Sequence, residues 1–268
     1  MKTRIISATV GIILLLIVVF APKEVLAAGM FILAVIGLHE FYSTVATAGY
    51  RPVKLIGYLA CIPIFIIGFT NNEYNKYTVL SVFAILAVLM GLIVFKHERY
   101  NIIDISLTTF GIMYVPFLFL FIILTRNLEN GFYFMWMIFI GAWVTDTFAY
   151  FTGVFLGKRK LIPPISPKKT VEGSIGGIAG CVAVMTLYGV LVINSRLGNI
   201  PLYHYIIISL LCGIISQVGD LAASAIKRYV KVKDYGKIMP GHGGVLDRFD
   251  SILFVAPVVY FYISFFII

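Results

Sequence analysis

The chain alternates long apolar runs with short polar connections from one end to the other. Most runs approach the roughly 20 residues that a helix needs to cross a bilayer. The pattern predicts nine membrane-spanning helices, at residues 4–21, 25–46, 53–70, 77–95, 102–124, 131–154, 173–194, 203–226 and 250–268. A transmembrane β-barrel would show shorter segments of alternating polarity instead. We therefore predict an all-α polytopic membrane protein.

Composition supports this class, because only 12% of the residues are charged, against about 25% in soluble domains. Cys61, Cys181 and Cys212 lie within apolar runs, which indicates small core residues rather than disulfides or zinc ligands. Residues 1–28 resemble a signal peptide, but the apolar run is long enough to predict an uncleaved first span.

The basic residues are distributed unevenly over the predicted connections. A net charge of +9 could indicate nucleic-acid binding, but most of these residues flank spans, so no nucleic-acid partner is expected. With the N-terminus in the cytoplasm, 17 of the 21 Lys and Arg fall on the cytoplasmic side. The positive-inside rule therefore predicts a cytoplasmic N-terminus and a C-terminus on the opposite side.

Two of the predicted cytoplasmic loops, 155–172 and 227–249, together hold 11 of those 17 charges. The loops within residues 1–130 are short and ordinary, so we expect packing, dimer contact or lipid access from that part. Residues 131–268 form the predicted catalytic region.

The eighth predicted span carries a polar face. Ser216, Asp220, Ser224 and Lys227 are spaced by 4, 4 and 3 residues, which places them on one side of a helix. Asp220 then lies roughly 10 Å below the cytoplasmic end of the helix. A carboxylate in a span usually faces a partner or a wet cavity. A structural pair with a buried Lys or Arg is the alternative.

Three other acidic residues lie in or near spans. Asp146 in the sixth span could serve the site or could be a helix–helix hydrogen-bonding residue, and the sequence favours neither. For Glu40 and Asp104 the sequence favours structural or interfacial roles.

The loop 227–249 contains Gly-His-Gly-Gly at residues 241–244, surrounded by basic residues. Such a loop can present backbone N–H groups to a phosphate. Positive-inside topology alone would explain the charges, but not the glycines around His242. Lys168 and Lys169 in the other loop precede a predicted helix start and are also candidate phosphate contacts. Gly173, Gly176, Gly177 and Gly180 are interpreted as small residues for close helix packing.

Asp247 and Asp250 follow the glycines, and Asp250 could instead cap the ninth helix. Asp220 and Asp247 come from different spans and suit Mg²⁺, which is typically held by one or two carboxylates, water and substrate oxygens. Direct ligation by His242 is the least favoured of its roles, because magnesium prefers oxygen. The sequence leaves open whether a second cation binds.

The run from Ser224 to Asp250 resembles the signature of phosphatidate cytidylyltransferases. It matches S-x-x-K-R-x4-K-D-x-G-x3-P-x-H-G-G-x-x-D-R-x-D over 27 residues. The sequence SPKKTVEG, at residues 166–173, also resembles this family. The motif-rich similarity covers roughly residues 141–255, and the first 130 residues match only as generic apolar spans.

The resemblance implies a Mg²⁺-dependent, homodimeric membrane enzyme that forms CDP-diacylglycerol and pyrophosphate from CTP and phosphatidate. The lipid phosphate would attack the α-phosphate of CTP directly, at a cavity facing the cytoplasm, and a bacterial inner membrane is the simplest location. The resemblance assigns Asp220 and Asp247 to the metal and Lys227, Arg228 and Arg248 to phosphate neutralisation. It places Asp146, Lys168, Lys169, Ser216 and Ser224 around the substrates. The loop residues His242, Gly243 and Gly244 are predicted substrate contacts as well.

Two other classes of function are weighed against this one. A transporter could use Asp146 and Asp220 as ion sites, but the polar residues gather toward one membrane face rather than the midplane. A CDP-alcohol phosphotransferase would need a DGxxAR run, which the sequence lacks. A polyprenol kinase stays possible, because PKKTVEG would suit other nucleotides.

Overall fold

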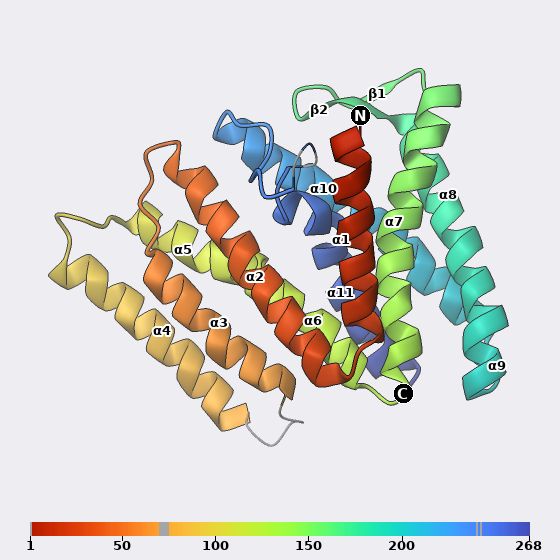
Figure 1. Ribbon diagram of the computed structural model, residues 1–268, viewed down its shortest axis with the longest axis horizontal. Coiled ribbons are helices and arrows are strands. Elements are labelled where there is room, and N and C mark those ends of the chain that lie inside the picture. Colours follow the sequence, from red (N-terminus) through yellow and green to blue (C-terminus); the bar gives the residue numbers. More distant parts are fainter. Residues whose placement is uncertain (1, 70–74, 240, 242) are drawn as a thin grey trace. The chain divides into compact units, whose positions relative to one another are not determined.

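The computed structural model describes residues 2–69, 75–239, 241 and 243–268, and His242 lies outside this set. The chain is largely helical (Figure 1). Its helices are α1 (Lys2–Phe20), α2 (Lys23–Ala46), α3 (Lys54–Phe69), α4 (Asn75–Phe95), α5 (Ile102–Tyr114), α6 (Pro116–Asn127), α7 (Gly131–Leu156), α8 (Val171–Tyr188), the π-helical turn η1 (Gly189–Ile193), α9 (Asn194–Leu197), α10 (Leu202–Tyr229) and α11 (Leu246–Phe266).

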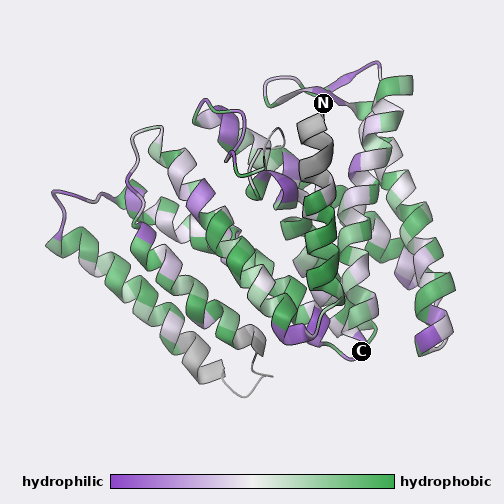
Figure 2. Ribbon diagram, viewed as in Figure 1, coloured by the Kyte–Doolittle hydropathy of each residue, from purple (hydrophilic) through white to green (hydrophobic). Residues whose placement is uncertain are grey.

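Each of the nine predicted spans overlaps a helix, and the chain is an integral membrane protein. Among the described residues, six helical stretches are long and apolar enough to cross a bilayer: Lys23–Ala46, Ile102–Asn127, Gly131–Leu156, Val171–Leu197, Leu202–Tyr229 and Leu246–Phe266. Thr9–Phe20, Lys54–Ile66 and Leu80–Phe95 are shorter apolar helical stretches, so the count of nine spans stays a prediction. Figure 2 shows apolar helices joined by more polar connections.

Two predicted elements differ from the structure. The span at 102–124 is divided between α5 and α6 at Val115, because Pro116 lacks an N–H and restricts the residue before it. The loop 155–172 of the predicted all-α fold contains an antiparallel hairpin of β1 (Lys160–Ile162) and β2 (Ser166–Thr170). Two prolines, at 163 and 164, occupy its turn, where their restricted backbone favours the reversal.

The chain divides into two compact units. The first comprises Met1–Ile123 and Tyr229–Arg248, and the second comprises Leu124–Arg228 and Phe249–Ile268. The predicted boundary at residue 130 lies near this division. However, the glycine-rich segment groups with the N-terminal helices rather than with the predicted catalytic region.

The first unit has aromatic residues at its centre. Helix α3 packs against α2, α4 and α5. The Tyr42 ring on α2 is fully buried, and its hydroxyl donates to the carbonyl oxygen of Thr108 on α5 at 2.8 Å. Gly57 and Gly111 leave room for this ring, because a Cβ atom at either position would overlap it. The first unit therefore fixes α2 between α3 and α5.

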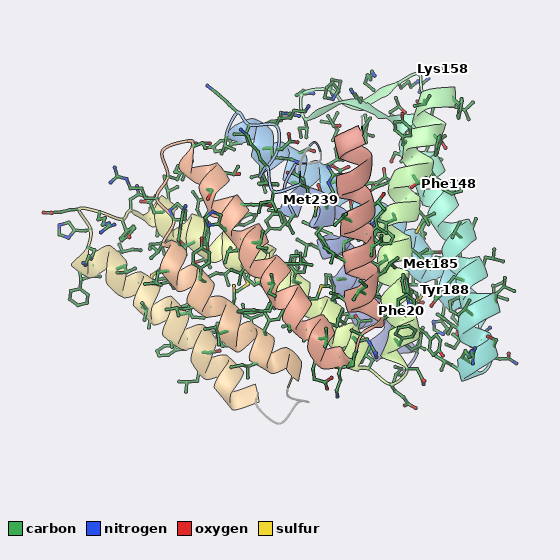
Figure 3. All side chains as sticks on the ribbon, in the orientation of Figure 1. Phe20, Phe148, Lys158, Met185, Tyr188 and Met239 are labelled. Carbon is green, nitrogen blue, oxygen red and sulfur yellow. The ribbon has the colours of Figure 1, made fainter. Side chains whose placement is uncertain are left out.

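The second unit is built on close contact between α7 and α8, which run side by side (Figure 1). A Cβ atom at Gly177 would lie 2.8 Å from the carbonyl oxygen of Thr145. One at Gly180 would overlap the ring of Phe148, labelled on α7 in Figure 3. The predicted packing role of the α8 glycines is confirmed. All three cysteines of the chain are buried and free, as predicted.

Candidate active site

In the second unit, Asp146 of α7 and Asp220 of α10 both lie near Asp250 of α11. The Asp250 carboxylate interacts electrostatically with Asp220, Asp146 and Lys227. Gly219 makes the approach possible, because a Cβ atom there would lie 2.8 Å from the carbonyl oxygen of Asp250. Close packing of α10 on α11 therefore brings acids from separate helices together.

Asp220 has side-chain partners from two elements. Its Oδ2 forms an ion pair with the ammonium group of Lys169 on β2, and Ser224 donates to its Oδ1 at 3.4 Å. The side chains of Lys169 and Asp220 are each 27% exposed. The ammonium nitrogen of Lys169 is itself buried, however, so the pair also fits the structural alternative of an Asp paired with a buried Lys. The sequence predicted Lys169 and Asp220 as separate site residues, and the hairpin brings Lys169 into contact with Asp220.

Several hydroxyl groups accompany the acids. Ser251 donates from its hydroxyl to Asp146 at 3.2 Å and from its backbone N–H to Asp250 at 2.8 Å. Ser216 is fully buried, and no described group forms a hydrogen bond with its hydroxyl. It lies one turn from Asp220 on the continuous helix α10, as the predicted polar face requires. A buried hydroxyl is stabilised by a hydrogen-bond partner or by coordination to a cation, so Ser216 is available as an oxygen donor.

The capping alternative for Asp250 is wrong. Helix α11 begins at Leu246, so Asp250 lies in its second turn and cannot be the N-cap residue. Asp250 is also only 9% exposed. This acid is instead part of the group formed with Asp146 and Asp220.

The glycine-rich segment of the first unit wraps around Asp247. The Oδ2 atom of Asp247 accepts N–H groups from Tyr235 at 2.8 Å and Gly244 at 2.9 Å. Gly243 has a φ of +87°, and a Cβ atom there would lie 2.8 Å from the same oxygen. The carbonyl oxygen of Gly243 accepts the N–H of Met239, labelled in Figure 3, at 2.9 Å. The N–H of Gly244 is therefore used within the loop, and phosphate contacts by Gly243 and Gly244 stay a prediction.

The predicted cationic residues come from α10, from α11 and from the hairpin. Lys227 and Arg228 end α10, where cations oppose the helix dipole, and Lys227 is only 8% exposed. Lys168 on β2 and Arg248 on α11 are exposed. The hairpin is fixed at its base, because the Glu172 carboxylate accepts the N–H groups of Lys158 at 3.0 Å and Arg159 at 3.1 Å.

The donor groups suit a hard cation with few protein ligands. In the part of the chain that the structure describes, no three His, Cys, Asp or Glu side chains form a metal-binding group. Magnesium, however, needs only one or two carboxylates besides water and substrate oxygens. Asp220 already holds the ammonium group of Lys169, and the hydroxyl of Ser216 has no described partner. These oxygen donors fit Mg²⁺.

The structural role that the sequence favoured for Glu40 is confirmed, but its partners were not predicted. Glu40 accepts the N–H groups of Val245 at 3.0 Å and Leu246 at 2.8 Å, across 205 residues of sequence. A carboxylate inside an apolar span signalled that Glu40 needs a polar partner. The sequence could not identify that partner, because it consists of backbone N–H groups, which every residue except proline carries. For Asp104 the predicted structural role is confirmed, because it forms a capping box with Asn101 and accepts the N–H of Arg51.

Comparison with known proteins defines the class. The model of the cytidylyltransferase family matches residues 2–266, so the chain belongs to this family of nucleotidyltransferases. Relatives named phosphatidate cytidylyltransferase include one from Bacillus subtilis, 34% identical over 271 residues, which cover 99% of this chain and 98% of the relative. One from Staphylococcus saprophyticus is 33% identical over 259 residues, 97% of each chain. The family resemblance of the sequence is confirmed.

Proposed function

We propose that this protein transfers the cytidylyl group of CTP to phosphatidate, forming CDP-diacylglycerol and pyrophosphate. The observation that carries the proposal is the contact of Lys169 with Asp220 beside two further acids and the end of a span. This arrangement offers cations for phosphates and oxygens for a metal near the level where a lipid headgroup meets a soluble nucleotide. The names of the relatives support the same substrates.

The proposed chemistry needs no general base. The phosphate of phosphatidate is anionic at neutral pH and attacks the α-phosphorus of CTP, with pyrophosphate as the leaving group. The protein then has to align the two phosphates and neutralise their charge. Lys227, Arg228 and Arg248 serve this role, with Lys168 and Lys169 on the hairpin. Around the substrates we place Asp146, Ser216, Ser224, His242, Gly243 and Gly244.

Magnesium is the proposed cofactor, held by Asp220 and Asp247. When bound, it supplies charge neutralisation to the nucleotide phosphates. The two N–H groups that Asp247 accepts fix the orientation of its carboxylate. Asp250, which approaches Asp220, is an additional acid that the sequence-based assignment did not include.

The proposed setting is a bacterial inner membrane, with nine spans, the N-terminus and active site facing the cytoplasm, and a homodimer as the assembly. The uneven distribution of Lys and Arg supports this orientation. The bacterial origin of the relatives supports the location.

One assay tests the function. Purified protein in detergent is given labelled CTP, phosphatidate and Mg²⁺, and CDP-lipid and pyrophosphate are measured. We expect equal amounts of both products, and none after metal chelation. Replacing CTP with ATP is the control. Phosphorylation of a lipid by ATP, without CDP-lipid from CTP, would replace this proposal with a lipid kinase.

A further inference from the structure

Glu40 lies on α2 but contacts the backbone where the glycine-rich segment becomes α11. Its Oε1 accepts the N–H of Val245 at 3.0 Å, and its Oε2 accepts the N–H of Leu246 at 2.8 Å. The N–H of Val245 immediately precedes α11 and that of Leu246 is in its first turn, so no carbonyl within the helix can accept either. Glu40 is 3% exposed, so water does not replace it as the acceptor.

The glycines of the segment are shaped around this carboxylate. A Cβ atom at Gly236 or Gly244 would overlap the Glu40 side chain. One turn further along α2, Thr44 donates its hydroxyl to the carbonyl oxygen of Tyr235 at 3.0 Å. Helix α2 therefore holds the segment at two points, and the space that Glu40 needs accounts for two of the glycines.

The contact lies at the start of the helix that carries Asp247. Leu246 is the first residue of α11, Asp247 is the next, and Asp250 follows one turn later on the same helix. Fixing the N–H groups of Val245 and Leu246 fixes the start and rotation of this helix. Misplacing a reactive group by about 1 Å can cost about 100-fold in rate.

We propose that Glu40 is a positioning residue for nucleotidyl transfer, which acts by fixing the start of α11 and thereby Asp247. This inference rests on the proposed function. It gives the N-terminal helices a part in the reaction that their generic sequence does not indicate. Glu40 itself touches no reacting atom in this scheme.

The main test is Glu40→Gln, with Glu24→Gln as the matched control, because Glu24 is exposed on the same helix. An amide can accept at only one of its two terminal atoms, so one N–H loses its acceptor. We expect kcat to fall by about 10- to 100-fold, as for other orienting groups, while the KM for CTP changes little. Glu40→Asp, which keeps the charge, should recover part of kcat, and Glu24→Gln should match the unchanged protein.

Two readouts independent of turnover accompany the kinetics. Hydrogen exchange at the amides of Val245 and Leu246 should accelerate in Glu40→Gln. Gly244→Ala should lower thermal stability in the unmodified protein, because the added methyl group would overlap the Glu40 side chain. In a protein that already carries Glu40→Ala, Gly244→Ala should cause a much smaller further loss of stability. Unchanged exchange, additive losses, or a wild-type kcat in Glu40→Gln would each overturn the inference.

Failure of the two proposals can be told apart. If the unmodified protein forms no CDP-lipid, the proposed function fails, and so does the positioning role in that reaction. The exchange and stability measurements would still establish whether Glu40 anchors α11. If the unmodified protein is active but Glu40→Gln keeps its kcat, only the positioning inference fails.

Discussion

Acidic residues of this membrane protein form two sets with different hydrogen-bond partners. Glu40, Asp104 and Glu172 each accept two backbone N–H groups at the start of a structural element or turn. Asp220 and Asp146 instead accept from side chains, namely Lys169, Ser224 and Ser251. The first set anchors the backbone, whereas the second set pairs with side chains.

Asp247 and Asp250 test this distinction because each departs from what the sequence suggested. Asp247, the predicted metal ligand, accepts two backbone N–H groups like an anchor. Asp250, the suggested cap, lies near Asp220 and Asp146 but accepts the backbone N–H of Ser251. The set to which an acid belongs therefore cannot be assigned from its place in the motif alone.

The largest expected effect comes from Asp220→Asn. Loss of this charge should lower kcat by about 1,000-fold or more, comparable to removal of a principal transition-state contact. CDP-lipid formation measures the loss, and thermal unfolding should show a protein that is still folded. Near-normal turnover would remove Asp220 from the metal site and weaken the division into two sets.

Asp247→Asn separates anchoring from catalysis at one residue. We expect turnover to be nearly abolished, with expression and dimerisation retained. We also expect a stability loss of about 1 kcal/mol, because the hydrogen bonds from Tyr235 and Gly244 lose their charged acceptor. Kinetics and thermal unfolding should be measured on the same preparation. A stability loss with wild-type kcat would make Asp247 an anchor only.

Lys169→Met should have the next largest effect. Removing the ammonium group leaves Asp220 without its cation and the substrates without one phosphate contact, so kcat should fall by about 100-fold. Lys169→Arg should recover part of this, and Lys168→Met is the neighbouring comparison, with a smaller loss expected from its exposed side chain. Equal losses at both lysines would contradict a special role for the contact with Asp220.

Asp104→Asn examines a member of the anchoring set away from the proposed chemistry. Weakening the capping box and the hydrogen bond from Arg51 should cost about 1 kcal/mol of stability. The kcat and KM values should be unchanged for the folded fraction. A fall in kcat at full folding would show that anchoring and catalysis are not separable in this way.

The smallest effect is expected from Lys23→Ala. Lys23 is exposed at the start of α2 and is predicted to lie on the side opposite the active site. Its replacement should change stability by less than about 0.5 kcal/mol and leave turnover intact. A large loss of activity would contradict the predicted orientation in the membrane.

The helices could be predicted because an apolar run of about 20 residues matches the thickness of a bilayer and rarely forms anything but a membrane-spanning helix. The polar face of α10 followed equally directly from spacing along one helix. The hairpin was missed because its strands have three and five residues, too short for a periodic pattern. Contacts such as Lys169 with Asp220 or Glu40 with Val245 join distant segments, and a single sequence carries no signal for such pairs.

The distance along the chain between Glu40 and its two partners has a consequence for biogenesis. At about 5–20 residues per second, ribosomes need roughly 10–40 s to synthesise the 205 residues that separate Glu40 from Val245. During that interval the second helix carries an acid whose final acceptor role is unfilled, a costly state within a span. The hydrogen bonds that hold Glu40 are therefore completed only after Val245 and Leu246 are made, so α2 and the glycine-rich segment reach their final packing together.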